Sequence, residues 1–350
     1  MTSAFFLPYT ILQIPAGYVA DRRGSRRLIT VSLLALTAST SLLGWVSQLT
    51  LALLLRAIAG IAAAGIFVPG IRLIAKLYPE RSGAAIGTLG SSVGAGSLYV
   101  SLLAPTLSMW VGWRLTILVL ILPGLLILAL FAASSYDEPI QGSSTRQKFP
   151  TRILREGAIW MLGYQQFARL GVAISLLTWL PTFFASSLGY DVLFSGLALA
   201  LLSGVSIISN PIGGILADRI RSHSRVTALS FSVMAAALMS IALFALGLTA
   251  WLLIIIAGWF AFAYFGPMFA ILPRLFGVEV AGLASGFQNM LASIGGILVP
   301  FLFGYLRDVT GAFVVPWVFL ALMCIAGFLV GVPLMRLESG MRKTKGTSQV

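Results

Sequence analysis

The chain has 350 residues, of which 59% are hydrophobic and 9% are charged, and its formal net charge is +13. A soluble globular domain has about 25% charged residues, so this composition excludes that class. The basic residues fall in short clusters between apolar runs, which argues against nucleic acid as a partner. We therefore expect a membrane protein whose surroundings are the lipid bilayer.

Apolar runs of the length that crosses a bilayer, about 20 residues, recur along the chain. No β-barrel alternation is present in the sequence, so we expect an all-α integral membrane protein. Eleven transmembrane helices are predicted, at residues 3–20, 28–46, 51–75, 84–107, 115–134, 157–184, 193–216, 226–247, 250–273, 282–306 and 314–336.

One long polar stretch, residues 136–155, separates the fifth predicted helix from the sixth and is typical of a linker. It divides the chain into an N-terminal lobe at 1–135 with five helices and a C-terminal lobe at 156–338 with six. A basic tail follows at 339–350.

The basic residues indicate how the helices are oriented. Successive connections must lie on alternate sides of the membrane, and Lys and Arg gather on the cytoplasmic side. Of the 23 such residues, Arg114 and Arg307 fall on the opposite side, and Arg56 and Arg169 fall inside helices. We therefore expect a multi-pass protein of the cytoplasmic membrane with the linker and the C-terminus in the cytoplasm and Met1 outside.

The two lobes carry an internal repeat. Pro69 recurs at Pro267, and the near-constant offset extends over five helices, which predicts two homologous halves. The predicted helix at 157–184 has no counterpart, so the first half is expected to lack its first helix. A charged motif is repeated 197 residues apart, as Gly17, Asp21 and Arg22 and then as Gly214, Asp218 and Arg219.

The stretch "GYVADRRGSRR" at 17–27 resembles the pattern G-x-x-x-D-R-x-G-R-[RK] of the major facilitator superfamily of secondary transporters. Ser25 stands where that family usually has arginine. The stretches "LRAIAGIAAAG" at 55–65 and "GWR" at 112–114 are similar to further family features. The resemblance implies a two-lobe helical bundle, usually of twelve helices, of which this chain would contain the second to the twelfth. The matching positions are Gly17, Asp21, Arg22, Gly24 and Arg26.

In that family the motif acts as a conformational latch on the cytoplasmic face, and the resemblance implies the same role here. Asp21 follows the predicted end of a helix, where the helix dipole disfavours a carboxylate unless cations are near. We expect Arg22, Arg26 and Arg27 to be those cations. In the second copy Arg221 occupies the place of the loop glycine, and a residue with a side chain disfavours a tight turn there. The alternative is that these arginines serve membrane topology alone.

Two arginines inside predicted helices are candidates for binding a solute, because a charged side chain at membrane depth is costly and must face protein or water. Arg169 lies near the middle of its helix, and Gln165 and Gln166 precede it by about one turn. Arg56 lies in another helix. The alternative for both arginines is a structural pairing.

Weaker solute-site candidates follow from the family's layout of cavity-lining helices. Each of these residues could instead form only an interhelical hydrogen bond. They are Gln13 with its neighbour Tyr9, Asn210, Tyr264, Asn289 and Gln288.

These features predict a secondary active transporter of a small organic solute, with an anion favoured because Arg169 has no acidic partner inside the predicted helices. A proton-coupled drug or sugar transporter is the alternative within this class, and a transporter-derived sensor or an inactive remnant is the alternative outside it. No enzyme motif, metal site or cofactor site is evident, and a monomer is expected. His223, in a basic loop, is expected to be solvated, and Cys324 is expected to be a packing residue.

Overall fold

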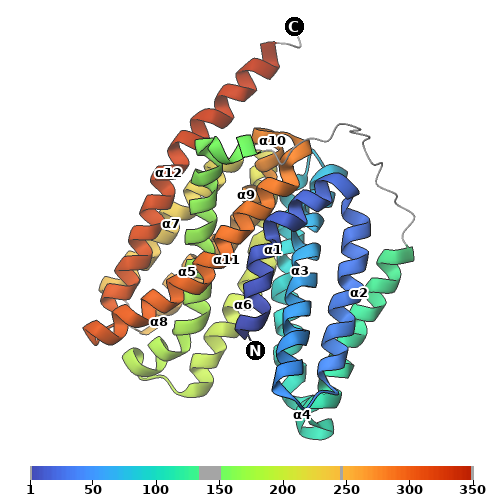
Figure 1. Cartoon of the computed structure of the whole chain (residues 1–350). Helices are drawn as coiled ribbons and strands as arrows, with labels where there is room; N and C mark the ends of the chain where they lie inside the picture. Colours follow the sequence, from blue (N-terminus) through green and yellow to red (C-terminus); the bar gives the residue numbers. More distant parts are fainter. Residues whose placement is uncertain (1, 134–150, 245–246, 348–350) are drawn as a thin grey trace. The chain divides into compact units, whose positions relative to one another are not determined.

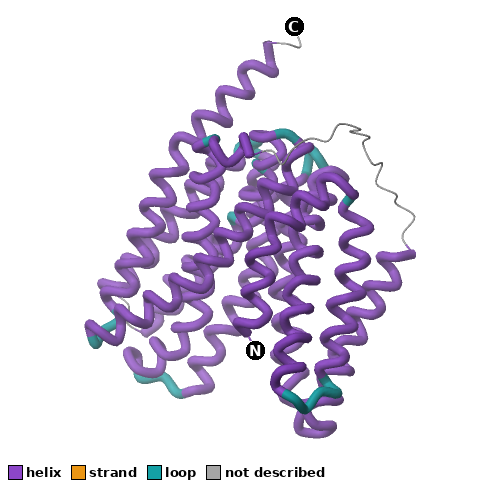
Figure 2. Tube along the Cα trace, in the orientation of Figure 1, coloured by secondary structure: helices purple, strands orange, loops and turns teal. Residues whose placement is uncertain are grey.

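A computed structural model describes residues 2–133, 151–244 and 247–347, and these residues form helices with no strand among them (Figures 1 and 2). The first helices are α1 (Thr2–Arg23), α2 (Ser25–Leu43), α3 (Leu49–Leu77) and α4 (Ser82–Ala133). After a short 3-10 turn, η1 (Thr151–Arg155), come α5 (Gly157–Leu188), α6 (Val192–Arg219) and α7 (His223–Phe244). The chain continues with α8 (Gly247–Ala263), α9 (Phe265–Ala270), α10 (Leu272–Phe276), η2 (Val278–Val280), α11 (Ala281–Thr310) and α12 (Val314–Thr347).

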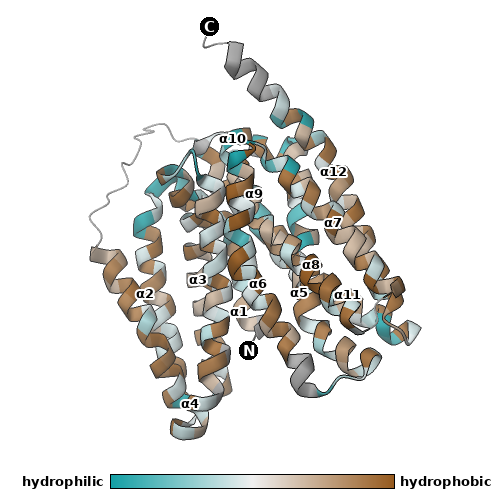
Figure 3. Cartoon of the chain, turned by 180° about the vertical axis from the view of Figure 1, so that it is seen from behind, coloured by the Kyte–Doolittle hydropathy of each residue, from teal (hydrophilic) through white to brown (hydrophobic). Residues whose placement is uncertain are grey.

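The prediction of an all-α membrane protein is confirmed. Ten segments in the described residues are long and apolar enough to cross a bilayer. α1, which covers the predicted span 3–20, is a helix of 22 residues but is not among those ten. On α2, large apolar side chains including Val31, Leu34 and Leu42 are exposed, and hydrophobic residues recur along this helix in Figure 3. Such a surface suits contact with lipid.

Glycine and proline set the breaks in the long helical segments. α4 contains both the fourth and the fifth predicted spans, which are separated at Gly112, where φ is +74° and ψ is 162°. The segment from Gly247 to Phe276 is interrupted at Tyr264 and again at Ile271. Pro267 has no N–H with which to bond the carbonyl of Ala263, and its ring clashes with that carbonyl, which explains the interruption at Tyr264.

The chain forms two compact units. Unit 1 comprises Met1–Leu77, Gly96–Ile153 and Phe276–Met290. In this unit α3 packs against α1 and α2, with small residues such as Ala59 and Ala64 fully covered at the helix surfaces. A Cβ added at Gly60 would overlap the carbonyl oxygen of Phe5, so glycine allows α3 to approach α1 closely.

Unit 2 comprises Tyr78–Ala95, Leu154–Leu275 and Leu291–Val350. Its packing is dominated by α7 against α12 and α8, and by α6 against α8. Four aromatic rings from α5, α11, α12 and the turn before α12 form one cluster, with centroids 5.0–6.2 Å apart: Phe183, Phe303, Phe313 and Trp317. The division into sequence lobes at 1–135 and 156–338 stays a prediction.

Candidate functional site

Unit 1 places the carboxylate of Asp21 against the start of a distant helix. α1 continues through Asp21 to Arg23, and the carboxylate accepts hydrogen bonds from the backbone N–H groups of Gly282 at 3.1 Å and Leu283 at 2.9 Å. These groups belong to the first turn of α11, where N–H groups have no partner within the helix and the helix dipole favours an anion. We call this arrangement the Asp21 contact.

Glycine makes the Asp21 contact possible. One turn before Asp21, a Cβ added at Gly17 would overlap the carbonyl oxygen of Gly282. A Cβ added at Gly282 would lie 2.5 Å from Asp21 Oδ1. The backbones of α1 and α11 therefore approach at a pair of glycines, and this approach brings the acid within reach of the N–H groups.

Unit 2 contains the same arrangement in the second copy of the motif. Asp218, in the last turn of α6, accepts hydrogen bonds from the N–H groups of Gly83 at 3.3 Å and Ala84 at 2.8 Å, which begin α4. A Cβ added at Gly214 would overlap the carbonyl oxygen of Gly83. We call this the Asp218 contact. The two copies of the motif therefore have the same geometry. In each copy the acid follows, by four residues, a glycine at which two helices approach closely, and the acid accepts hydrogen bonds from the start of the second helix.

The cation beside Asp21 is different from those expected. Arg72, on α3, places its Nε 2.8 Å from Asp21 Oδ1 and donates from Nη1 to Ser25 Oγ at 3.1 Å. The guanidinium of Arg22 instead lies over the ring of Tyr18, 4.6 Å from its centroid. Arg26 donates a hydrogen bond to the carbonyl oxygen of Ala132 at 3.2 Å. No sequence pattern indicated this pair, because Arg72 is 51 positions from Asp21.

The turn after each of the two motifs contains a residue with positive φ. Gly24 has φ of +84°, which glycine tolerates without strain. Arg221, 197 residues later, has φ of +52° and is the one non-glycine residue with positive φ in the described chain. The second copy therefore forms its turn without glycine, at the conformational cost that a larger side chain has in this region.

Arg169 lies in the middle of α5 and is 6% exposed. Its guanidinium carbon is 5.6 Å from the centroid of the Tyr264 ring and 5.3 Å from that of Phe265, which is within the range of cation–π attraction. No hydrogen bond partner is found for Arg169 Nε, and no carboxylate in the described residues is within ion-pair distance of this side chain. The buried guanidinium of Arg169 therefore lies against two aromatic rings and not against a carboxylate.

The aromatic residues beneath Arg169 come from the interrupted helix. Tyr264 precedes α9 and is fully buried, and its hydroxyl lies 2.9 Å from the carbonyl oxygen of Gln165 and 3.3 Å from Gln166 Oε1. These contacts fix the ring beneath Arg169. Gln166 Nε2 is buried and has no hydrogen bond partner. Arg169, Gln166 and Tyr264 thus form one polar group in unit 2.

The side chain of Gln165 is directed elsewhere. Its Nε2 donates a hydrogen bond of 2.9 Å to the carbonyl oxygen of Gly327 on α12. This is a hydrogen bond between two helices, α5 and α12. Asn210, also in unit 2, donates to the carbonyl oxygen of Ser206 one turn earlier on α6, and its Oδ1 is buried without a partner.

The remaining solute-site candidates lie in unit 1. Asn289 Nδ2 donates to the hydroxyl of Tyr9 at 3.0 Å. Gln13 is fully buried on α1, and a Cβ added at Gly286 would overlap its carbonyl oxygen. Both amide atoms of Gln288 are buried without a partner, as is Nε of Arg56. The structure therefore groups Tyr9 with Asn289, and it describes no contact that joins Arg56 to them.

The expectation that His223 is solvated is wrong. This residue begins α7, and its side chain is fully buried between two carboxylates, those of Asp218 and Glu338. Glu338 is also buried. No sequence pattern distinguished these two residues, because they are 115 positions apart and meet only when α12 packs against α7.

Comparisons with known proteins agree with this architecture. The family model of the Major Facilitator Superfamily matches residues 1–300. The crystal structure of the E. coli fucose:proton symporter FucP has a TM-score of 0.76 at 20% identity, covering 94% of this chain and 88% of that one. The proton:xylose symporter XylE, bound to 6-bromo-6-deoxy-D-glucose, has a TM-score of 0.76 at 15% identity, with 93% and 83% covered. At these identities the likeness concerns the fold.

Three curated relatives cover more than nine tenths of this chain. The probable sulfoacetate transporter SauU of Cupriavidus necator is 26% identical, with 94% of this chain and 81% of the relative covered. The probable galactarate/D-glucarate transporter GudP of Bacillus subtilis is 24% identical, with 93% and 81% covered. The probable nitrate transporter NarT of Staphylococcus aureus is 26% identical, with 91% and 82% covered.

Proposed function

The chain belongs to the Major Facilitator Superfamily, and from this premise we propose that it is a secondary transporter that carries a small organic anion across the cytoplasmic membrane by alternating access. The observation that carries the proposal is the environment of Arg169. A buried guanidinium without an acidic partner has donors left over, and its planar fork can bind a carboxylate, sulfonate or nitrate group through two hydrogen bonds.

The surroundings of Arg169 support an exchangeable anion rather than a fixed counterion. The rings of Tyr264 and Phe265 offset part of the cost of burying the charge, by about 0.5–2 kcal/mol for each favourable contact. That cost is about 2.5–3.5 kcal/mol for an arginine at the centre of a membrane helix on insertion scales. The site can therefore remain folded without a ligand. The amide of Gln166, with an unpartnered donor, adds a further hydrogen bond for the solute.

The relatives support the anion class. Sulfoacetate, galactarate, D-glucarate and nitrate, named for three of them, are all anions that a guanidinium can bind. We propose Arg169, Gln166 and Tyr264 as the anion subsite, with Asn210 on the same unit. Gln165 helps to hold the helix that carries this subsite, because its side chain forms a hydrogen bond with Gly327 on α12. Gln13, Asn289 and Arg56, which lie in unit 1, stay predictions as solute-binding residues.

The Asp21 and Asp218 contacts are proposed as the two conformational latches. Each joins an acid to the start of a helix through hydrogen bonds that a small movement of either helix would break. With the basic loops in the cytoplasm, both latches lie on the cytoplasmic side. The driving force is then a gradient of an ion or of a second solute.

The proposal is tested by flux in proteoliposomes containing the purified protein. Uptake of labelled sulfoacetate, D-glucarate and nitrate is compared with that of L-fucose, with empty liposomes as the blank. Saturable uptake of at least one anion, with L-fucose at the blank level, supports an anion transporter. Uptake of L-fucose alone would overturn the anion class. Binding of an anion without flux would instead identify a sensor.

A further inference from the structure

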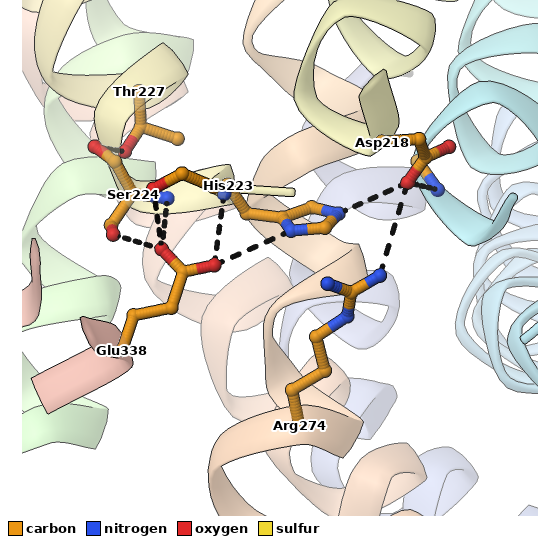
Figure 4. Close-up of polar contacts among 8 residues, drawn as sticks. Asp218, His223, Ser224, Thr227, Arg274 and Glu338 are labelled. Carbon is orange, nitrogen blue, oxygen red and sulfur yellow. Dashed lines mark hydrogen bonds and ion pairs between the residues drawn. The ribbon is translucent and has the colours of Figure 1, made fainter. Parts of the chain in front are cut away.

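His223 connects two acids that lie on different helices. Its imidazole is fully buried, and Nε2 forms a hydrogen bond of 3.2 Å with Asp218 Oδ1 on α6. Nδ1 lies 3.5 Å from Glu338 Oε1 on α12, which is within ion-pair distance but is not a hydrogen bond (Figure 4). The two ring nitrogens thus face two different carboxylates. This is the single histidine of the chain.

Each of these carboxylates also holds the start of a helix. Glu338 accepts hydrogen bonds from the backbone N–H groups of His223 and Ser224, both at 3.0 Å, at the start of α7. It also accepts hydrogen bonds from the hydroxyl groups of Ser222 and Ser224. Asp218 holds the start of α4 through the Asp218 contact. The imidazole is therefore the link between two helix starts.

The link is complete only when the imidazole is charged. A neutral imidazole has one N–H and one lone pair, so it can donate to one of the two carboxylates and must present its lone pair to the other. The imidazolium has two N–H groups and can donate to both. Because the charged ring attracts both carboxylates in a buried setting, loss of its charge weakens the cluster appreciably.

One further charged side chain in the described residues lies near Asp218. Arg274 on α10 places Nη2 3.9 Å from Asp218 Oδ1, and it remains charged over the whole range in which histidine titrates. The start of α4 contributes uncharged N–H groups. Among the ionisable side chains whose burial the structure describes on the adjoining segments, those that are exposed are Glu80, Arg81, Arg219, Arg221, Arg225 and Arg336.

We propose that His223 is a proton-binding site that regulates the Asp218 contact in response to pH on its side of the membrane. When His223 is protonated it ties Asp218 to Glu338 and holds the starts of α4 and α7 together. Since only the charged ring can donate to both carboxylates, this stabilisation is present while His223 is protonated and is lost when a rise in pH removes the second proton. The consequence for transport, an Asp218 latch released more readily at alkaline pH, rests on the proposed function.

The protonation state can be observed directly, because the chain has one histidine. The protein is purified without a histidine tag, with 15N-labelled histidine, in detergent or nanodiscs. NMR at pH 6.0 should find both ring nitrogens protonated, and NMR at pH 8.5 should find one of them without a proton. A ring that is neutral at pH 6.0, or that keeps both protons at pH 8.5, would refute the proposal.

Hydrogen exchange measures the link itself. After correction for the intrinsic effect of pH, the amides of Ala84 and Ser224 should exchange about tenfold faster at pH 8.5 than at pH 6.0. In His223→Gln, which is neutral throughout, this difference should disappear. The control is a His223→Gln, Ser339→His double variant, which places one histidine at an exposed position next to Glu338 on α12. It should behave as His223→Gln. A difference of equal size in parent and His223→Gln would overturn the link.

Neither measurement involves a solute, so both remain valid if the proposed anion transport fails. If flux is found, its dependence on the pH of the compartment facing His223 should be reduced in His223→Gln. If the pH dependence of flux is the same in His223→Gln as in the parent, His223 does not regulate transport. The hydrogen-exchange result would then still support the proton-binding site.

Discussion

Asp21 Oδ2 lies 2.9 Å from the backbone nitrogen of Leu283, so a charge-assisted hydrogen bond joins the last turn of α1 to the first turn of α11. Asp218 Oδ2 makes the same connection to Ala84 at 2.8 Å, from α6 to α4. In both places a carboxylate lies where a helix dipole favours a negative charge. In both motifs the aspartate therefore accepts hydrogen bonds from the first turn of a helix. The arginines of the loop that follows the aspartate do not take part in these bonds.

Asp21→Asn is expected to slow transport while leaving solute affinity within a few-fold. The amide keeps one acceptor oxygen but loses the charge, which weakens the bonds to Gly282 and Leu283 and the ion pair with Arg72. The latch changes the balance between states more than it changes the anion subsite. Initial flux rates and equilibrium binding, measured on the same preparation, check this. Flux equal to that of the parent would remove the latch role.

Arg72→Gln should destabilise the protein much more than Arg22→Gln. The first change leaves Asp21 without its ion-pair partner in a mostly buried setting, for which losses of about 3–5 kcal/mol are typical. The second removes a cation that lies over Tyr18. Thermal unfolding in one detergent compares the two. A greater loss of stability in Arg22→Gln would instead identify Arg22 as the cation that stabilises Asp21.

Gly214→Ala should impair folding or transport, whereas Gly204→Ala on the same helix should be neutral or slightly stabilising. A methyl group at 214 would overlap the carbonyl oxygen of Gly83, and a backbone atom cannot move aside as a flexible side chain can. At Gly204 the added Cβ would meet nothing within 4 Å, and alanine is the better helix former by about 1 kcal/mol. Melting temperatures and flux of the pair provide the test. Equal behaviour would show that the close approach of α6 and α4 is not required.

Tyr264→Phe and Tyr264→Leu separate the two roles of this residue. Phenylalanine keeps the ring under Arg169 but removes the hydroxyl contacts with Gln165 and Gln166, at a cost of about 1 kcal/mol in stability. Leucine also removes the cation–π contact. Anion affinity should therefore fall little in the first variant and clearly in the second. Equal affinities in the two variants would show that the ring does not position Arg169.

The sequence predicted the positions of the helices well, but it predicted the side-chain contacts between helices poorly. Length and apolarity place a membrane helix without knowledge of its neighbours, and the repeated Gly17 and Gly214 motifs predicted two equivalent sites. The cation beside Asp21 was misassigned because loop arginines are adjacent in sequence, whereas Arg72 reaches Asp21 only through the packing of α3 against α1.

The polar residues of the membrane interior show the same limit. Arg169 was identifiable because a buried charge is costly wherever the helix packs. The direction of a side chain depends on tertiary packing, which is why Gln165 bonds Gly327 and Gln166 meets Tyr264 although the two glutamines are neighbours. His223 was assigned to solvent because a histidine in a basic loop carries no sign that two distant acids will enclose it.

The anion subsite is tested most directly by anion binding to purified, monodisperse Arg169 variants. Arg307→Gln is the control because Arg307 is only partly buried and is paired with Asp308 near the end of α11. The titrant is whichever of sulfoacetate, D-glucarate and nitrate the parent binds. Arg169→Lys keeps the charge but loses the two-bond fork, so affinity should fall clearly, by about tenfold or more, and in Arg169→Gln binding should be nearly abolished. Arg307→Gln should bind as the parent does. Unchanged affinity in Arg169→Gln, in protein that remains folded, would contradict the account.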